Sequence, residues 1–513
     1  MTTMTLATLN TATRTFSLGD QRAFAALSGD NNPIHMDPLE ARRSLFGAPV
    51  VHGVHALLWG VDHALASESL GAEDPASGVQ DVRGAQDHNV VRLAIASLRA
   101  TFIKPMRVGE AVDLSIKGGP SDYTLHWTRS ADQASLAKVR LHLMPASELD
   151  ALPWPSPDAP TSRALSDAMF DPASNPSGEI PLHLPREAAR RMFPRACACL
   201  IPSDVATLLA ATRLVGTECP GLYSVFSEID IRRSISPGGP LTSMDYRVES
   251  FDDRFQRVQI GVAAPSLTGT LAAFLRPPPQ HQAAFADIKR CVEPGEFDGQ
   301  RALVIGGSRG LGEVAAKLLA AGGADVVISY HQGKADAQAV VDDICAEGGR
   351  ASCLQLDALA LPPPHSTRDN LAADAEPVPT HLYYFASPFI FAATKGRFSP
   401  DLFGRFCDYY VLGFLRIVNH FAALGLRNVF HPSTSALDEL PLHMGEYAAA
   451  KGASEVVGQF IEKATRGMVV HQPRLPRMAT DQTASLVPIP SEDPAPILLA
   501  ELRRFKSLGS VST

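Results

Sequence analysis

The sequence predicts two α+β units with antiparallel sheets, followed by one α/β unit with a doubly wound parallel sheet. Its length of 513 residues exceeds what one hydrophobic core supports, since about 150 residues per domain is usual. Two proline-rich stretches, 151–182 and the one that begins at Arg276, interrupt the chain. After the second stretch the hydrophobic pattern changes from alternating runs to a repeat of strand and helix.

The composition narrows the class of protein. Hydrophobic residues make up 45% and charged residues 19% of the chain, which is typical of globular proteins. A formal charge of −8 gives no indication of a nucleic-acid partner. No run reaches the roughly 18 apolar residues of a membrane span, and the first residues lack the pattern of a signal peptide. We therefore expect a cytoplasmic protein without a membrane span.

The first two units follow from their periodicity. The apolar run 51–65 predicts a helix, and a second helix is predicted over about 203–214. Strands of a half-buried sheet are predicted where apolar residues alternate, as in Val112, Leu114, Ile116, then Tyr123, Leu125, Trp127, then Val139, Leu141, Leu143. Alternating apolar residues also predict strands between residues 223 and 275. The predicted boundaries are 1–150 for the first domain, 151–182 for a linker, 183–278 for the second domain and 279–298 for a second linker.

The third unit, 299–513, alternates strands and helices. Strand-like runs at 301–305, 324–330 and 351–357 are each followed by a helix-like run or a break, as in βαβ units of a parallel sheet. The polar, proline-rich stretch 359–379 takes the place of one expected helix. Such a composition predicts a loop.

A first group of candidate catalytic residues lies within six positions, from Asp30 to His35. Dehydration of a 3-hydroxyacyl thioester needs a base for the C2 proton and an acid for the departing hydroxyl, and Asp30 and His35 offer both. Gly53 opens the predicted helix, where its backbone N–H could stabilise a negatively charged thioester oxygen. Alternatively, Asp30 caps a turn and His35 has a local structural partner.

This region resembles the MaoC-like (R)-specific enoyl-thioester hydratases. The motif D-x-N-P-I-H is followed by F-G-x-P-V-V-H-G and F-I-K-P-M-R-V-G-E, and the resemblance covers about residues 15–145. It implies a hot-dog fold, a catalytic dyad of Asp30 and His35, and the Gly53 amide as oxyanion donor. The middle segment lacks the motif. It therefore resembles the non-catalytic half of double-hot-dog members, which completes the sheet and shapes an acyl tunnel.

Metal binding is not predicted. His55 and His63 lie eight residues apart on the predicted helix, but no third ligand accompanies them. We expect both to be structural histidines.

A second group begins at a glycine-rich loop after the strand 301–305. Gly306, Gly310 and Gly312 lie where a dinucleotide phosphate would meet a helix N-terminus. The next strand ends without the acidic residue that accepts the ribose hydroxyls of NAD, and Arg309 and Lys334 are available for a 2′-phosphate. We therefore expect NADP(H) as cofactor, with Asp357 near the adenine.

Tyr447 and Lys451 lie four residues apart on one predicted helical face. A neighbouring ammonium lowers the pKa of a phenol, which allows proton exchange with a substrate carbonyl during hydride transfer. With the glycine loop and the hydroxyls of Ser433, Thr434 and Ser435, this pattern resembles the short-chain dehydrogenase/reductase family over residues 299–513.

That resemblance makes Tyr447 the acid, Lys451 its activator and cofactor ligand, and Thr434 the hydroxyl partner, with Ser433 and Ser435 as alternatives. It also places the cofactor against a set of loop residues: Gly306, Ser308, Arg309, Gly310, Leu311, Gly312, Asp357 and Ala386. The sequence departs from the family pattern at several positions, which are Ile305, the run 385–388, Tyr410 and Pro473-Arg474.

Together these features predict a bifunctional enzyme. It would reduce 3-oxoacyl thioesters with NADPH and dehydrate the resulting 3-hydroxyacyl thioesters, in fatty-acyl or polyketide-like biosynthesis. The thioester would be carried by CoA or acyl carrier protein, and the protein would form a homodimer. Three alternatives remain at this point: a dehydratase with a structural reductase-like domain, a reductase for an unrelated carbonyl or sugar, and a non-enzymatic acyl-carrier-binding scaffold.

Overall fold

The computed structural model describes residues 10–66, 92–147, 154–161, 165–174, 176–234, 241–360, 378–393, 396–486 and 489–510. The chain forms two compact units, Met1–Pro278 with Ser485–Val487, and Pro279–Ala484 with Pro488–Thr513. The predicted loop at 359–379 lies mostly outside the described residues. None of the described helices is both long enough and apolar enough to span a membrane.

The N-terminal unit is built on one ten-stranded antiparallel sheet, in the order β1-β3-β4-β5-β2-β7-β10-β9-β8-β6. Its strands are β1 (Asn10–Thr15), β2 (Leu93–Phe102), β3 (Ala111–Gly118), β4 (Asp122–Arg129), β5 (Ser135–Pro145), β6 (Ser177–Pro181), β7 (Ser224–Arg233), β8 (Ser243–Asp252), β9 (Arg257–Ala263) and β10 (Leu267–Leu275). Strands β2 and β7 join the two halves, with Ala100 opposite Ile229. The two predicted α+β units therefore share a sheet.

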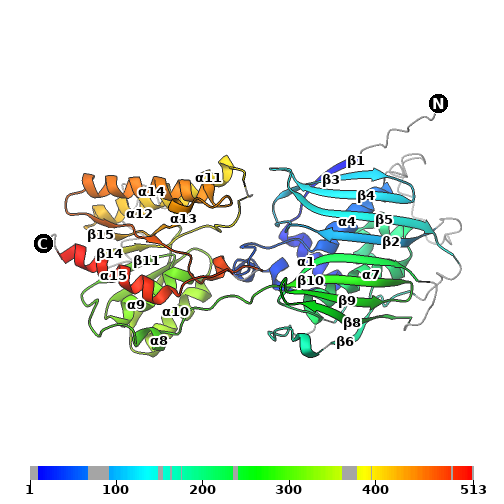
Figure 1. Cartoon of the computed structure of the whole chain (residues 1–513), viewed down its shortest axis with the longest axis horizontal. Coiled ribbons are helices and arrows are strands. Elements are labelled where there is room, and N and C mark those ends of the chain that lie inside the picture. The colour runs from blue at the N-terminus through cyan, green and yellow to red at the C-terminus, as the bar shows by residue number, and fades with distance from the viewer. Residues whose placement is uncertain are drawn as a thin grey trace. The chain divides into compact units, whose positions relative to one another are not determined.

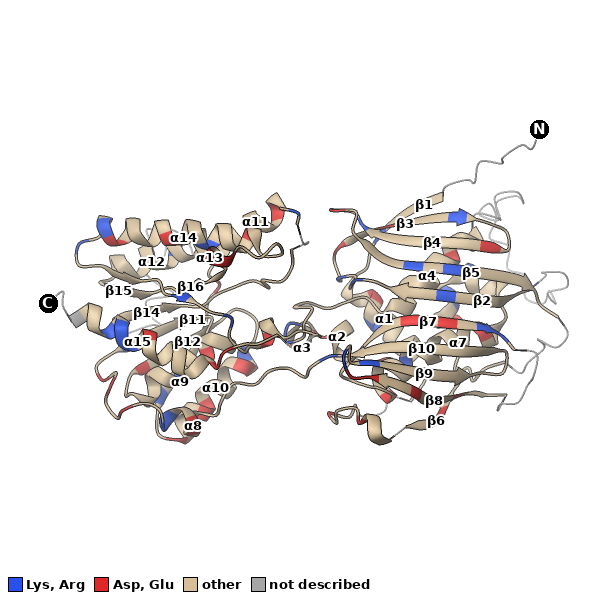
Figure 2. Cartoon of the chain, in the orientation of Figure 1, with Lys and Arg blue, Asp and Glu red and all other residues tan. Residues whose placement is uncertain are grey.

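Helices cover one face of this sheet (Figure 1). They are α1 (Leu18–Ser28), α4 (Gly53–Ala66), α5 (Arg186–Met192), α6 (Pro194–Cys199) and α7 (Pro202–Arg213), whereas the short helices α2 (Pro33–Met36) and α3 (Pro38–Ala41) lie in the connection between α1 and α4. Lys, Arg, Asp and Glu residues recur along the strands of the sheet (Figure 2), and the exposed Arg99 of β2 pairs with Glu228 of β7 at 2.9 Å. One face is thus apolar and the other charged, as the alternating sequence requires.

The main hydrophobic core of this unit lies between the sheet and the helices. It contains side chains from both halves, among them Leu58, Trp127 and Leu208. The core needs Gly60 on α4, because a Cβ there would lie 2.3 Å from the ring of Trp127. The stretch 151–182 does not separate two cores, and it contains β6. A strand that ends in Pro181 is tolerated there because β6 is the edge of the sheet.

The C-terminal unit is a doubly wound parallel sheet in the order β13-β12-β11-β14-β15-β17. Its strands are β11 (Arg301–Ile305), β12 (Asp325–Tyr330), β13 (Arg350–Gln355), β14 (His381–Tyr384), β15 (Asn428–Phe430) and β17 (Val469–His471), with a small pair of β16 (Ser433–Thr434) and β18 (Arg474–Leu475). The strand order reverses between β11 and β14. Ligands of open α/β sheets bind at such a point, beyond the carboxyl ends of the strands.

Helices pack on both faces of the parallel sheet, where the two larger hydrophobic clusters of this unit lie. They are α8 (Phe285–Lys289), α9 (Gly310–Ala321), α10 (Lys334–Ala346), α11 (Pro400–Cys407), α12 (Phe414–Ala423), α13 (Ala436–Glu439), α14 (Gly445–Ala464) and α15 (Pro494–Ser510). A π-helical turn, Asp408–Gly413, connects α11 to α12. The predicted change from an antiparallel to a parallel sheet is confirmed.

Candidate active sites

Asp30 and His35 lie in the short connection between α1 and α4. Helix α1 ends at Gly29, whose φ of +80° turns the chain. Asn32 then caps α2, which carries His35. The ligand atoms of Asp30, His35 and His52 all lie within 4.8 Å of one another. The structure therefore brings the two predicted residues together and adds His52, the residue before Gly53.

The carboxylate of Asp30 is buried and accepts two hydrogen bonds. Thr212 Oγ1 donates to Oδ2 at 2.7 Å, and the backbone N–H of Asn32 donates to Oδ1 at 3.3 Å. Burial raises the pKa of Asp30 to about 6, although both hydrogen bonds favour the charged form. At neutral pH the carboxyl group is therefore mostly ionised.

The imidazole of His35 is held in one tautomer. Its Nδ1 donates to the carbonyl oxygen of Val50 at 2.7 Å, so Nε2 carries the lone pair. Burial lowers the pKa of His35 to about 4, and the nearby positive charge of Arg276 contributes to this shift. His35 is therefore neutral at physiological pH and can accept a proton at Nε2.

His52 packs against both members of this pair. Its ring stacks on the ring of His35, with centroids 3.7 Å apart. Its Nδ1 lies 2.9 Å from Gln21 Oε1, and its Nε2 lies 3.1 Å from the backbone oxygen of Asp30. With the His52 nitrogens and His35 Nδ1 occupied by protein partners, this arrangement suits proton transfer better than metal binding.

The other residues predicted near this site occupy the start and the body of α4. Gly53 is the first residue of α4, and a Cβ there would lie 2.9 Å from the ring of Phe102. His63 Nδ1 donates to the backbone oxygen of Trp59 at 3.0 Å. His55 is buried, stacking on Phe24 with ring centroids 4.8 Å apart. Neither histidine reaches the Asp30 group.

The glycine loop of the C-terminal unit lies at the reversal point of the sheet. Gly306 has a φ of +77° and Gly310 a φ of +60°, values that side chains rarely adopt. A Cβ on Gly306 would lie 2.9 Å from the backbone nitrogen of Ala386, and one on Gly312 would lie 2.3 Å from the oxygen of Gly306. Ser308, Arg309 and Leu311 fill the positions between these glycines. The loop is therefore a tight backbone turn against the end of β14.

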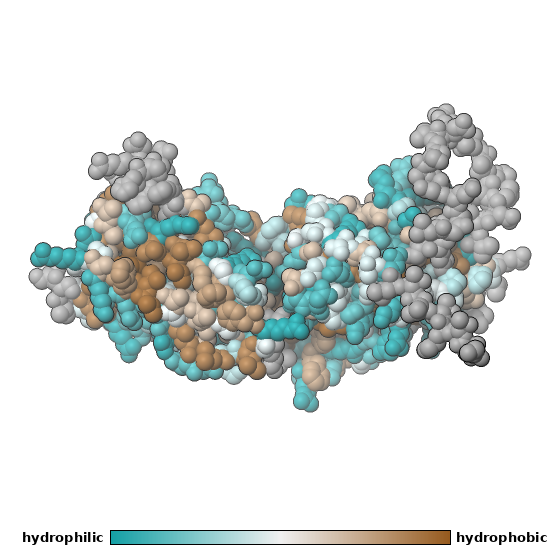
Figure 3. Space-filling model, turned by 90° about the horizontal axis from the view of Figure 1, so that it is seen from above, coloured by the Kyte–Doolittle hydropathy of each residue, from teal (hydrophilic) through white to brown (hydrophobic). Residues whose placement is uncertain are grey.

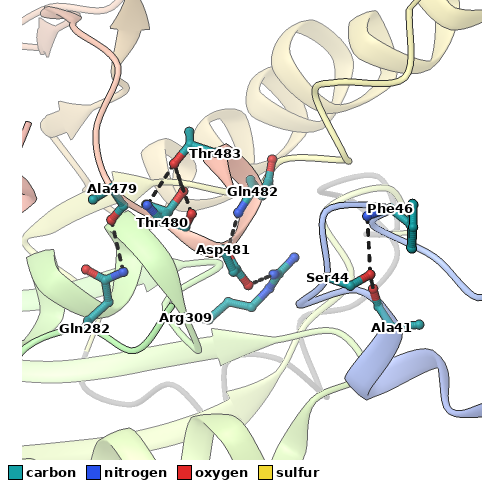
Figure 4. A network of polar contacts seen from close by, with 10 residues as sticks. All are labelled: Ala41, Ser44, Phe46, Gln282, Arg309, Ala479, Thr480, Asp481, Gln482 and Thr483. Carbon is teal, nitrogen blue, oxygen red and sulfur yellow. Dashed lines mark hydrogen bonds and ion pairs between the residues drawn. The ribbon is translucent and has the colours of Figure 1, made fainter. Parts of the chain in front are cut away.

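Helix α9 begins at Gly310, and the side chain of its N-cap residue, Arg309, makes no capping hydrogen bond. The guanidinium group of Arg309 instead forms an ion pair with Asp481 of the turn Asp481–Thr483 (Figure 4). Beyond β12, His331 Nδ1 lies 3.7 Å from Asp357 Oδ2. Arg309 and Asp357, which we predicted to contact the cofactor, thus both have protein partners.

Tyr447, Lys451 and Thr434 form the second candidate catalytic group. The hydroxyl of Thr434 lies beside Tyr447 and acts to lower the pKa of its phenol. Lys451 Nζ donates to the backbone oxygen of Pro432 at 2.7 Å and lies 4.1 Å from the ring centroid of Tyr410. Ser433 instead donates to Glu455 at 2.5 Å. Of these two neighbouring hydroxyls, it is Thr434 that acts on the pKa of Tyr447.

Burial shifts both titratable groups toward their neutral forms. It raises the pKa of Tyr447 to about 12, against the hydrogen bond from Thr434. It lowers the pKa of Lys451 to about 7, while Glu455 favours the ammonium. Tyr410, at the position where the family pattern has asparagine, places its hydroxyl 2.6 Å from Ser387 Oγ. At neutral pH this site holds a protonated phenol beside a lysine that is about half charged.

Comparisons with known proteins place a family on each unit. Residues 3–119 match the MaoC like domain, and residues 300–361 match the short chain dehydrogenase family. An uncharacterized oxidoreductase of Methylorubrum extorquens is 47% identical over 62 residues, 12% of this chain and 25% of the relative. A 3-oxoacyl-[acyl-carrier-protein] reductase of Synechocystis is 50% identical over 56 residues, 11% and 23% of the two chains.

The chain thus spans about a quarter of the length of these curated relatives. Among solved structures, a short chain dehydrogenase from Burkholderia cenocepacia in complex with NADP is 31% identical. That similarity covers 36% of this chain and 78% of the other, with a TM-score of 0.32.

Proposed function

We propose that this chain, which carries a MaoC-like domain at its N-terminus and a short-chain dehydrogenase domain after it, is a two-step acyl-thioester enzyme. Its C-terminal unit would reduce 3-oxoacyl thioesters with NADPH, and its N-terminal unit would dehydrate the 3-hydroxyacyl products. The observation that carries the proposal is the pair of a buried Asp30 and a half-buried His35, whose ligand atoms lie within 4.8 Å of each other. We interpret the ten-stranded sheet as a double hot dog.

Dehydration would begin with proton removal, because both groups of the pair are unprotonated at neutral pH. The pair takes the C2 proton of the 3-hydroxyacyl thioester, and the released electron pair forms the C2–C3 double bond. The C3–O bond breaks, and the pair returns the same proton to the departing hydroxyl as water. Asp30 and His35 end in their starting forms, so the same pair can run the reaction in the hydration direction.

The thioester oxygen gains negative charge while the C2 proton is removed. The backbone N–H of Gly53 is at the N-terminus of α4, where the helix dipole favours an anion. We assign this amide the stabilisation of the oxyanion.

The C-terminal unit has features that fit a dinucleotide. Gly306 and Gly312 leave room for close approach to the backbone, and the uncapped start of α9 offers N–H groups to a phosphate. We assign cofactor contacts to Gly306, Ser308, Arg309, Gly310, Leu311, Gly312, Asp357, Ala386 and Lys451. The absence of an acidic residue directly after β12 favours NADP(H) over NAD(H).

In the reduction, a hydride would reach C3 of the substrate from the reduced nicotinamide when NADPH is bound. Tyr447 would donate its phenolic proton to the carbonyl oxygen, with the hydroxyl of Thr434 beside it. The Lys451 ammonium would stabilise the phenolate that remains. One relative is the 3-oxoacyl-[acyl-carrier-protein] reductase of Synechocystis, which supports a 3-oxoacyl thioester as substrate.

A homodimer is part of the proposal. Apolar side chains gather on one face of the C-terminal unit (Figure 3). On α14, Val456 and Phe460 are 66% and 68% exposed, and Leu442 nearby in sequence is 66% exposed. Large exposed apolar residues of this kind commonly mark protein interfaces.

The test supplies a 3-oxoacyl thioester and NADPH and follows the products by mass. Wild type should form the enoyl thioester, Asp30→Asn should accumulate the 3-hydroxyacyl thioester, and Tyr447→Phe should leave the substrate untouched. If no variant or wild type oxidises NADPH while enoyl thioesters are still hydrated, the chain is a dehydratase with a structural reductase-like domain. Unchanged activity in Asp30→Asn would instead point to a scaffold or another acid-base pair.

A further inference from the structure

We propose that Thr212, on helix α7 of the second half, is a positioning residue for the dehydratase site, which holds the Asp30 carboxylate ionised and in one orientation. This inference rests on the proposed dehydratase function. It gives the second half, which lacks the acid-base motif, a direct part in the chemistry of the first.

The contact is direct and closed to solvent. Thr212 lies in the last turn of α7, 3% exposed, and its hydroxyl donates to Asp30 Oδ2 at 2.7 Å across 182 residues of sequence. Asp30 itself is 2% exposed. A hydroxyl that donates to a carboxylate stabilises its ionised form, more strongly where water is excluded.

The turn after α7 is shaped to receive the carboxylate. Gly216 lies in the π-helical turn Leu214–Glu218, and a Cβ there would lie 2.2 Å from Asp30 Oδ1. Asn32 Nδ2 donates to the backbone oxygens of Gly216 and Leu222, both at 3.1 Å. The loop that carries Asp30 is therefore hydrogen bonded both to this turn and to the backbone at Leu222.

The titratable side chains around Asp30 do not take over the role of the Thr212 hydroxyl in stabilising the ionised carboxylate. His35 and His52 face Asp30, and burial keeps both in the neutral form at physiological pH. Arg213 of α7 donates to the backbone oxygen of Pro181, and Arg276 donates to that of Leu222. Among the described residues no ion pair to Asp30 is formed, so its ionisation depends on hydrogen bonds, of which the one from Thr212 is the shorter.

The experiment measures the pH dependence of enoyl-thioester hydration in Thr212→Val, Thr212→Ser and the matched control Thr207→Val. Thr207 is also buried on α7, but its hydroxyl donates to the backbone oxygen of Ser203 at 2.8 Å. Loss of a hydrogen bond to a charged group should raise the acid limb of Thr212→Val by about one pH unit or more. Thr212→Ser should restore the wild-type limb, and Thr207→Val should leave it unchanged.

A second readout does not require turnover. The infrared band of the protonated Asp30 carboxyl can be assigned as the band missing in Asp30→Asn, and its titration gives the Asp30 pKa directly. The proposal predicts a higher pKa in Thr212→Val and a wild-type value in Thr212→Ser. An unchanged pKa in Thr212→Val would overturn it. If wild type does not hydrate enoyl thioesters but the infrared titration shifts, the proposed reaction is wrong and the Thr212–Asp30 contact still stands.

Discussion

The two candidate sites of this chain start from opposite protonation states. At Asp30 and His35, the pKa values of about 6 and about 4 leave both groups without a proton at neutral pH. At Tyr447 and Lys451, the values of about 12 and about 7 leave the phenol protonated. The N-terminal site thus starts as a base and the C-terminal site as an acid.

The protonation state that burial produces depends on the type of group that is buried. Desolvation favours the neutral form of any group, so it deprotonates an imidazole or ammonium and protonates a phenol or carboxyl. Asp30 escapes full protonation because Thr212 and Asn32 donate to it. The two proposed reactions should therefore respond to substitution and to pH independently and in opposite directions.

The largest expected effect is a substitution in the glycine loop that removes NADPH binding and leaves the N-terminal site active. Gly306→Val should abolish NADPH binding, because the added side chain meets the backbone of Ala386 and the φ of +77° disfavours it. Fluorescence titration with NADPH should show a loss of about 100-fold or more in affinity, which corresponds to about 2.7 kcal/mol. Enoyl-thioester hydration should be unchanged. Gly404→Ala is the control, since a Cβ there has no neighbour within 4 Å.

The decline of the dehydratase rate at low pH tests the role of Asp30 as part of the base. Dehydratase kcat/KM should fall about tenfold per pH unit below about pH 6, because protonation removes the Asp30 carboxylate. Steady-state rates between pH 4.5 and 8, roughly the range that brackets this pKa, would measure it. A profile that is flat down to pH 5 would contradict the assignment of Asp30 as the ionised partner.

The decline of the reductase rate at high pH tests the role of the Lys451 ammonium beside the proposed acid, Tyr447. The Lys451 ammonium is present below about pH 7 and is lost as pH rises through that value. Reductase kcat/KM should therefore decline above about pH 7, by up to tenfold per unit. In Lys451→Arg, whose guanidinium stays charged, any remaining activity should lack this decline. A reductase that becomes faster from pH 7 to 9 would show that the ammonium is not required.

The smallest expected effect concerns stability rather than chemistry. Both ring nitrogens of His55 are buried without a hydrogen-bond partner among the described residues. Leucine is similar in size and has no polar atoms, so His55→Leu should stabilise the protein by about 1 kcal/mol. Urea unfolding followed by tryptophan fluorescence measures this, with His63→Leu as a control, because His63 has a backbone partner. A lower midpoint for His55→Leu would mean that the imidazole has a structural role of its own.

Local patterns in the sequence predicted much of the fold. The alternation of Val112, Leu114 and Ile116 does place these side chains in the core. The run from 301 onward does form a parallel sheet. Periodicity could not show that β2 would pair with β7, because it defines which face of a strand is buried and not which strand lies beside it.

Local sequence patterns likewise predicted only those site residues that lie close together in the sequence. Asp30 and His35 are close in sequence, so one motif contains both. Thr212 and Gly216 reach Asp30 only through the packing of α7, and no local pattern marks them. His52 could have been found, since it directly precedes Gly53 in the same motif. The ion pair of Arg309 with Asp481 depends on a turn 172 residues later and was likewise not predictable.

The joining of the two halves through β2 and β7 has a consequence for stoichiometry. The motif D-x-N-P-I-H occurs once in the chain, and so does the Tyr447–Lys451 pair. A pair of identical single hot dogs would carry two acid-base motifs, whereas this fused sheet carries one. If both proposed reactions occur, every molecule supplies one reducing and one dehydrating centre, and their ratio is fixed at one to one whatever the level of expression.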